Sequence, residues 1–115
     1  MSERTPSELI EDIIEAINRI MIYIDNLTYN EFLDDLKTQD AVVRNIEIIG
    51  EAAKMIPLHI RQKYSRIPWK EIAGTRDKLI HDYFGVNFDI VWAIIKNDLP
   101  ELRKQIESIK SDMRF

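Results

Sequence analysis

Residues 7–27 read SELIEDIIEAINRIMIYIDNL, and this stretch decides the fold class. Its apolar residues recur every three or four positions, the spacing that places them on one face of an α-helix. They are Leu9, Ile13, Ile17, Ile20, Ile24 and Leu27, with Ile10, Ile14 and Met21 widening the face. Pro6 and Ser7, with Glu8 in the first turn, are typical of a helix start. We therefore predict a long amphipathic helix over residues 7–27.

Capping residues divide the next stretch into two further helices. Thr28 and Glu31 fit a capping box, in which each side chain bonds the backbone N–H of the other, and they predict a short helix to about residue 36. Thr38 or Asp40 is expected to cap a third helix that ends near residue 55, because Pro57 bars its continuation.

Glycine and proline punctuate the middle of the chain. Residues 57–65 are expected to form a connector with some helical turn, and Pro68 suits the first turn of a short helix. Gly74 is expected to end that helix in the left-handed conformation. The next predicted helix covers residues 76–84, and Gly85 terminates it.

Two more helices are expected in the last part of the chain. Asn87 is predicted to cap the first of them. Pro100 lacks a backbone N–H, so it should kink or restart the helix near residues 97–99. The final helix, residues 101–111, has an apolar face that consists of Leu102, Ile106 and Ile109.

Composition limits the class of protein. The chain has 115 residues, the size of a single domain that spans residues 1–115. No run of about 18 apolar residues exists that could cross a membrane, and no basic-then-apolar signal pattern opens the chain. The absence of Cys excludes disulfides and thiolate metal sites. A cytoplasmic protein is the simplest interpretation.

These elements predict an all-α fold. About five helices with short connections favour an up-and-down bundle. Apolar faces this wide on so few helices also suggest that a symmetric dimer completes their burial.

Charge is distributed unevenly along the chain, whose net charge is −4. Residues 1–53 carry a balance of −8, residues 54–78 one of +5 and residues 79–115 one of −1. The basic middle segment could hold a phosphate backbone, or it could be no more than a solvated loop and helix face.

The stretch RDKLIHDY, residues 76–83, holds the residues best suited to chemistry. Cleaving RNA without a metal requires an acid–base group and a cation that offsets charge on the phosphorane. His81 could supply the first and Arg76 the second. Asp77 precedes His81 by one helical turn, where its carboxylate can orient the imidazole, and Tyr83 follows Arg76 by two turns.

A single helix does not bring Arg76 and His81 together. Five residues of helix separate them by roughly 140° around the axis and about 7.5 Å along it. Two facing copies of the helix in a dimer would relieve this separation. On spacing alone, a structural role for Arg76, His81 and Tyr83 stays open. We find no Gly-rich phosphate loop and no metal-binding motif as a competitor.

Other polar and aromatic residues are given more ordinary roles. Asn45 lies among apolar positions of the third helix, so its amide must find a partner or lie at an interface. His59 has no acid nearby in sequence and is expected at the surface. The large aromatic residues are expected to fill the core or an interface rather than to stack on bases; they are Trp69, Trp92, Phe84 and Phe88.

The motif and its surroundings resemble the HepT-like toxins of the HEPN superfamily. That family has the pattern of Arg, four residues, His, one residue and Tyr, which residues 76–83 match without departure. Further matching text is RNIEIIGEA at residues 44–52, Pro-Trp at 68–69, and the segments 83–86, 90–92 and 97–100. The short motif is weak evidence alone, whereas the ordered set is specific and covers nearly everything from the third helix onward.

The resemblance implies a function, a partner and roles for particular residues. Members are helical dimers with the motif at the subunit interface, and they act as ribonuclease toxins without a cofactor or metal. Their partner is a minimal nucleotidyltransferase antitoxin that can transfer AMP from ATP to the motif Tyr. Carried over to this chain, Arg76 and His81 are the catalytic pair, Asp77 is an accessory residue and Tyr83 is the modification site.

From the third helix, Asn45 and Glu47 are expected to support the site. Two other functions remain as alternatives. The chain could be a non-catalytic helical dimer that binds a nucleotidyltransferase, or a plain structural helical protein. The intact Arg–His pair favours the ribonuclease.

Overall fold

The computed structural model describes residues 4–79 and 85–113 of the 115-residue chain. Within these ranges the chain forms helices and no strand. The helices are α1 (Pro6–Tyr23), α2 (Tyr29–Leu33), α3 (Leu36–Met55), α4 (Leu58–Lys63), α5 (Trp69–Ala73), α6 (Thr75–Leu79), α7 (Phe88–Ala93), the π-helix η1 (Ile94–Asp98) and α8 (Leu99–Met113). The all-α fold predicted from the sequence is confirmed. The helices outnumber the expected five because short connectors are themselves helical.

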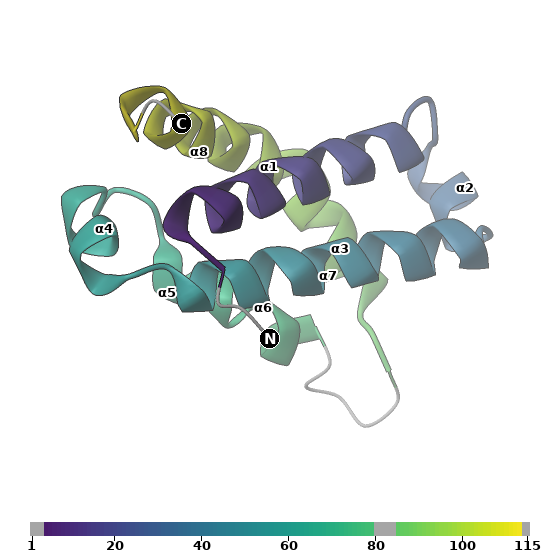
Figure 1. Ribbon diagram of the computed structural model, residues 1–115. Coiled ribbons are helices and arrows are strands. Elements are labelled where there is room, and N and C mark those ends of the chain that lie inside the picture. Colours follow the sequence, from purple (N-terminus) through teal and green to yellow (C-terminus); the bar gives the residue numbers. More distant parts are fainter. Residues whose placement is uncertain (1–3, 80–84, 114–115) are drawn as a thin grey trace.

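Helix α1 is the centre of the bundle. It packs on α3 along one side and on α8 along the other, and Figure 1 shows the three long helices side by side. Helices α5 and α6 pack on α3. The sequence motif starts on α6, so its first residues lie against α3. Among the described helices, none combines the length and apolar composition that crossing a lipid bilayer requires.

The hydrophobic core matches the predicted helix faces. The buried residues of α1 are Leu9, Ile10, Ile13, Ile14, Ala16, Ile17 and Ile20. In α8 the predicted apolar residues Leu102, Ile106 and Ile109 are all buried. Each large aliphatic side chain that is removed from water contributes about 1.5–3 kcal/mol, so these two faces are a main source of stability.

The helix starts follow local side-chain chemistry. At α2, Thr28 and Glu31 form the predicted capping box. The Thr28 N–H donates to the Glu31 carboxylate at 2.9 Å, and the Glu31 N–H donates to the Thr28 hydroxyl at 3.1 Å. At α7, the predicted cap Asn87 accepts bonds from the N–H groups of Asp89 and Ile90. Both predictions are confirmed. These caps could be predicted from the sequence because their bonds join residues only two or three positions apart.

The predicted C-terminal ends of the first two helices, α1 and α2, are wrong. Helix α1 ends at Tyr23 rather than near residue 27, and Asn26 adopts a left-handed φ of 63°. Helix α2 ends at Leu33, not near residue 36. The apolar repeat continues through Ile24, which is buried, although the backbone has already turned there.

The cap of α3 is also corrected. Asp35 caps it, not Thr38 or Asp40. One Asp35 oxygen accepts from the Thr38 backbone N–H at 3.0 Å and the other from the Thr38 hydroxyl at 2.7 Å. Because both carboxylate oxygens are used, this cap prevails over the alternatives and α3 starts at Leu36.

Gly74 is not left-handed, as the sequence suggested. Its φ is −87°, and α6 starts at once with Thr75, so the backbone stays close to right-handed helical geometry. The connector over residues 57–65 contains the six-residue helix α4. Of the helix expected over residues 76–84, the part up to Leu79 is seen, and residues 80–84 lie outside the described residues. Gly85, beyond them, has the positive φ of 111° that favours glycine.

Pro100 leaves the predicted irregularity in the last part of the chain. The turn before it is the π-helix η1, in which the Leu99 N–H donates to the Ile94 carbonyl five residues back. A proline ring clashes with the carbonyl four residues earlier and donates no hydrogen bond. The wider π-turn accommodates both restrictions, since it inserts one extra residue without ending the helix.

Replacing Asp35 with Ala should lower the melting temperature. The two bonds from Thr38, first the hydroxyl and then the backbone N–H, hold the pKa of this carboxyl below its ordinary value. The ionised carboxylate therefore stabilises the fold above the unfolded pKa of about 3.9, and this stabilisation is lost as pH falls through the lower folded pKa. Thermal unfolding followed by circular dichroism at neutral and acidic pH measures both effects.

Asp40→Ala is the matched control, because Asp40 is an exposed carboxylate in the same region of α3 that caps nothing. We expect little change in its melting temperature. Equal destabilisation by the two substitutions would contradict the assignment of the cap to Asp35.

Candidate functional site

The motif predicted from the sequence begins on α6. Asp77 and Lys78 are exposed on this helix, and Leu79 is buried in the core with 2% of its surface accessible. Arg76 lies on α6, but its side chain falls outside the described part of the structure, and so do His81 and Tyr83. The structure therefore shows where the motif starts and does not describe the approach of Arg76 to His81.

The chain on either side of the motif is held in place. Leu79 anchors the end of α6 in the core, and its carbonyl accepts a bond from the Asn87 N–H at 3.4 Å. Asn87 in turn caps α7. The residues on both sides of segment 80–84 are therefore tied to each other and to the bundle.

Helix α3 supports α5 and α6 through a close backbone contact. A Cβ added at Gly50 would lie 3.3 Å from the carbonyl oxygen of Ile72 and 3.6 Å from that of Ala73. The end of α5 thus approaches α3 at a distance that leaves no comfortable room for a side chain. Gly50 belongs to the block RNIEIIGEA, and this close contact explains why a residue without a side chain fits at that position.

The two supporting residues expected on α3 have different environments. Asn45 is 5% exposed, which confirms its predicted burial. Its Nδ2 donates to the Ala41 carbonyl at 2.9 Å, whereas its Oδ1 has no hydrogen-bond partner among the described residues. Glu47 is half-buried on the same helix. Whether either residue supports the motif chemically stays a prediction.

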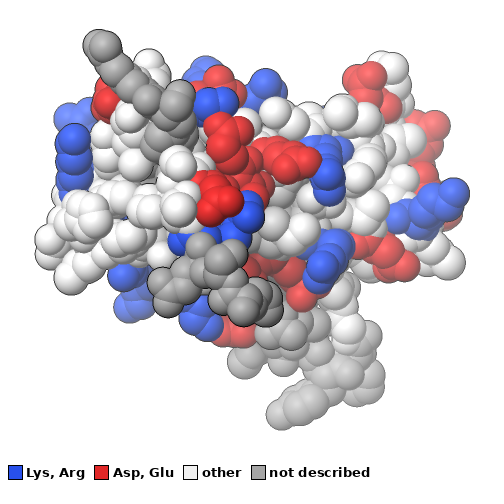
Figure 2. All heavy atoms as spheres, viewed as in Figure 1, with Lys and Arg blue, Asp and Glu red and all other residues white. Residues whose placement is uncertain are grey.

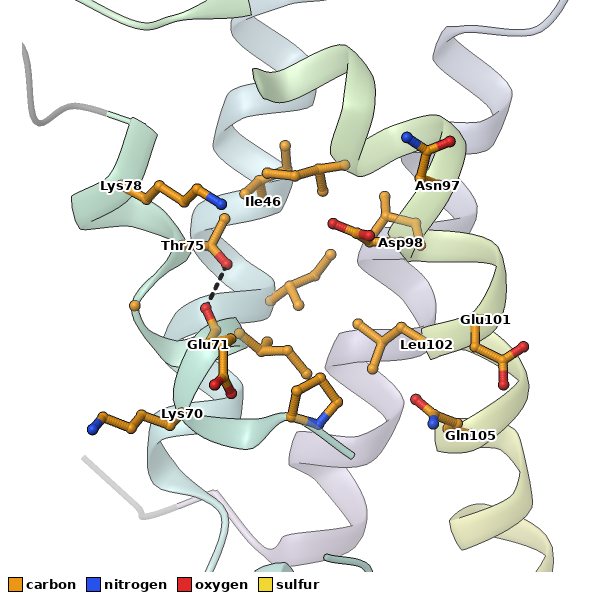
Figure 3. Close-up of a pocket in the computed structure, with 16 residues that line it drawn as sticks. Ile46, Lys70, Glu71, Thr75, Lys78, Asn97, Asp98, Glu101, Leu102 and Gln105 are labelled. Atoms are coloured by element: carbon orange, nitrogen blue, oxygen red, sulfur yellow. Dashed lines mark hydrogen bonds between the residues drawn. The ribbon is translucent and has the colours of Figure 1, made fainter. Parts of the chain in front are cut away.

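A groove of about 770 Å³ opens beside α6. Helix α3 contributes an apolar floor through Ile46 and Ile49, and Leu102 of α8 extends it. One wall consists of α5 and α6, and η1 and α8 form the other (Figure 3). Sequence reasoning missed this groove because its residues come from five separate elements.

Charged side chains of both signs line the groove, with Lys70, Glu71 and Lys78 on the wall of α5 and α6 and Asp98 and Glu101 on the other wall. Figure 3 shows the amine of Lys78 reaching over Ile46 from α6, and the carboxylate of Asp98 facing it from η1. Gln105 of α8 also points its amide inward. The Thr75 hydroxyl, in contrast, is already used in a bond to the Glu71 carbonyl at 2.9 Å.

The basic middle segment lies largely on the surface. In Figure 2, acidic side chains gather over the middle of the face that α1 presents, and basic side chains lie along the edge near α4 and α5. Its exposed members with described side chains are Lys54, Lys63, Arg66, Lys70 and Lys78. Both interpretations, a solvated face and a phosphate-binding edge, are compatible with this exposure.

Several residues are placed as the sequence indicated. His59 is exposed on α4. Trp69 is buried, and its indole N–H donates to the Tyr64 carbonyl at 3.1 Å. Trp92 and Phe88 pack around Phe32 with ring centroids 5.1 and 5.9 Å away. These aromatic residues serve packing, as predicted, and Phe84 lies outside the described residues.

The part of the chain that the structure describes contains no group of three or more His, Asp or Glu residues suited to a metal ion. His81 and Asp82 lie outside the described residues. The expectation of a metal-free site therefore stays a prediction, to be tested in solution.

Comparisons with known proteins agree on one family. The sequence pattern of the family described as HepT-like ribonucleases matches residues 13–109. A protein of Methanocaldococcus jannaschii described as a candidate RNase is 45% identical, over 98% of this chain and 93% of the relative. A protein of Thermococcus cleftensis named "Probable ribonuclease HepT" is 44% identical, over 94% and 98% of the two chains.

A more distant relative, the mRNA nuclease HepT of Shewanella oneidensis, is 28% identical over 90% of this chain and 94% of its own. No solved structure matches the chain with comparable significance.

Asn45→Leu should leave the melting temperature unchanged or raise it. The substitution removes an acceptor that has no partner among the described residues, and the Ala41 carbonyl that it releases lies inside α3. Gln39→Leu is the matched comparison: Gln39 is equally buried, and its amide bonds the carbonyls of Phe32 and Leu33 at 2.9 and 2.8 Å.

Losing these bonds should cost about 1–3 kcal/mol. Chemical denaturation of both variants measures the difference. If Asn45→Leu is as destabilising as Gln39→Leu, the Asn45 acceptor has a partner in the undescribed residues of the motif.

Proposed function

Because the chain belongs to the HepT-like ribonuclease family, we propose that it is an endoribonuclease toxin that cleaves cellular RNA, either tRNA or mRNA, without a metal ion. The observation that carries this proposal is the family match over residues 13–109, a range in which Arg76 and His81 both lie. The names of the relatives, which are ribonucleases, support the activity.

The proposed chemistry is an internal transesterification. His81 removes the proton from a ribose 2′-hydroxyl, whose oxygen attacks the adjacent phosphorus. The bond from phosphorus to the 5′-oxygen breaks, and a protonated group returns a proton to that oxygen. The products are a 2′,3′-cyclic phosphate and a free 5′-hydroxyl. Arg76 offsets the charge that builds on the phosphorane, and Asp77 acts as an accessory that orients the imidazole.

A homodimer is part of the proposal. On one regular helix, Arg76 and His81 would point roughly 140° apart, so one copy presents them poorly to a single phosphate. Two copies of the motif segment facing each other across a two-fold axis would combine the Arg76 of one protomer with the His81 of its partner.

A ribonuclease that acts in the cytoplasm of its own cell needs an off-switch. We assign this role to a partner nucleotidyltransferase that modifies Tyr83. The Tyr83 hydroxyl oxygen attacks the α-phosphorus of ATP, pyrophosphate leaves, and the hydroxyl proton passes to a base on the partner. The AMP group adds bulk and negative charge two residues from His81, and both oppose the binding of RNA.

His81→Ala and Arg76→Ala should each abolish RNA cleavage and growth inhibition. The first removes the acid–base group and the second the phosphate cation, and losses of about a hundredfold or more are typical for such groups. Incubation of the purified variants with total RNA tests this. EDTA should leave cleavage unchanged, and inhibition that a divalent ion reverses would contradict the metal-free mechanism.

His59→Ala is the matched control, since His59 is the other histidine of the chain and lies exposed on α4. Its activity should equal that of the wild type. Full activity in a folded His81→Ala variant would refute the catalytic assignment. A wild type that cleaves no RNA but binds a nucleotidyltransferase would favour the non-catalytic docking function.

Co-expression with the partner nucleotidyltransferase should add one or more AMP units to the peptide that contains Tyr83 and should abolish RNA cleavage. Mass spectrometry of the peptides measures the modification. Tyr83→Phe should escape it and remain active in the presence of the partner. Tyr23→Phe, which changes a partly exposed tyrosine at the end of α1, should be modified and silenced like the wild type. An inactive complex with unmodified Tyr83 would indicate inhibition by occlusion instead.

A further inference from the structure

The groove beside α6 has the features of a site for one nucleotide. Its volume of about 770 Å³ lies in the range of small-molecule sites. The floor is apolar, from Ile46, Ile49 and Leu102. Polar side chains line both walls, among them Lys78 on one and Asp98 and Gln105 on the other, and polar groups at defined positions fix the orientation of a ligand.

Lys78 and Asp98 point into the groove from opposite sides (Figure 3). Both side chains are exposed, and neither forms an ion pair with another described residue. A matching ligand carries an anionic group at one end, a flat apolar middle and N–H donors at the other end. A nucleotide has all three: a phosphate, a base with two π-faces, and an edge with N–H groups.

We propose that this groove binds the base of a guanine nucleotide next to the scissile phosphate, with Asp98 selecting the base and Lys78 holding its phosphate. The inference rests on the proposed ribonuclease function and names a specificity determinant for it. Guanine presents two adjacent donors, N1–H and the N2 amino group, and a carboxylate accepts two parallel hydrogen bonds. The other bases lack this donor pair, so they would leave one carboxylate oxygen without a partner.

The π-helix η1 provides an independent observation. It inserts one extra residue before Pro100, which shifts the residues after the turn by roughly 100° around the axis relative to the residues before it. Asp98 is the last residue of this turn. Asn97, Asp98 and Leu99 all line the groove, and Asp98 is the residue whose carboxylate faces Lys78 in Figure 3.

The location beside α6 connects the groove to the proposed chemistry. Lys78 follows Arg76 by two residues on the same short helix. A phosphate held by Lys78 thus lies near the segment that carries the proposed catalytic pair. Gln105, on the Asp98 side, offers an amide that can donate to the O6 acceptor of the same base.

The test uses the full chain and two measurements. The first measures by titration calorimetry how tightly the protein binds GMP, IMP, AMP, CMP and UMP. IMP is the sharpest probe, because hypoxanthine differs from guanine only by the missing N2 amino group. We expect GMP to bind about ten- to a hundredfold more tightly than IMP, as fits the loss of one hydrogen bond to a charged group. Asp98→Asn should remove this difference.

Lys78→Gln separates the two ends of the site. It should weaken the binding of GMP and leave the binding of guanosine, which has no phosphate, unchanged. Glu107→Gln makes the same carboxylate-to-amide change on the outer face of α8, where Glu107 bonds Arg103 at 2.8 Å, and should bind GMP like the wild type.

The second measurement is cleavage of short RNAs that differ at a single position, read by sequencing of the products. The wild type should prefer guanine beside the cleaved bond, and Asp98→Asn should lose that preference while still cleaving. Equal binding of GMP and IMP by the wild type, or an unchanged preference in a folded Asp98→Asn variant, would overturn the inference. Failure to cleave any RNA, with selective GMP binding retained, would refute the ribonuclease function and leave the nucleotide site standing.

Discussion

The close contact between α3 and α5 at Gly50 is the constraint on which the site depends. A methyl group there would meet the Ile72 carbonyl oxygen at 3.3 Å, so α5 would have to move away by a few tenths of an ångström if this position carried a side chain. A glycine inside a helix costs about 0.5–1 kcal/mol relative to alanine. In return, the contact sets the height of α5, and hence of α6, above α3. Helix α3 itself is positioned by its long packing surface on α1. The start of the motif at residues 76–83 is therefore placed by backbone contact with the most deeply packed part of the bundle.

How well the fold could be predicted depended on how local the deciding interaction is. The capping box at Thr28 and the cap at Asn87 depend on residues two or three positions apart, so both could be predicted from the sequence. The start of α3 could not be, since Asp35, Thr38 and Asp40 are all acceptable caps, and only the geometry shows that Asp35 engages Thr38 with both oxygens. The apolar repeat also predicted an end of α1 that lies too far along the chain. Ile24 is buried although the helix has already ended, because a turn can bury an apolar residue as well as a helix can.

The candidate site divides in the same way. Arg76, His81 and Tyr83 belong to one short stretch, so the chain itself displays their spacing. The groove is formed by α3, α5, α6, η1 and α8, and no pattern in sequence brings these elements together. Pro100 indicated an irregularity, and the structure has one, but a proline does not specify whether the helix kinks, restarts or widens. That choice sets the helical phase of the segment that contributes Asp98 to the groove. That the Oδ1 of Asn45 has no hydrogen-bond partner among the described residues likewise required coordinates, since the sequence showed only that an amide lay among apolar residues.

Charge gives the last link between the fold and a polyanionic substrate. A chain with a net charge of −4 does not attract RNA over its whole surface, so any attraction must be local. In Figure 2, basic side chains lie along the edge near α4 and α5, and others lie beside the acidic side chains of α1 and at the opposite end of the molecule. Contacts to phosphate from such an edge weaken with salt and carry no sequence information. Discrimination between RNA sites then has to come from a group that touches a base. An acidic side chain at the far wall of the groove suits that purpose, because a carboxylate repels the phosphates and accepts hydrogen bonds from the N–H groups of a base. Attraction and selection would thus reside on opposite walls of one groove, with α6 carrying the first and the π-turn before Pro100 carrying the second.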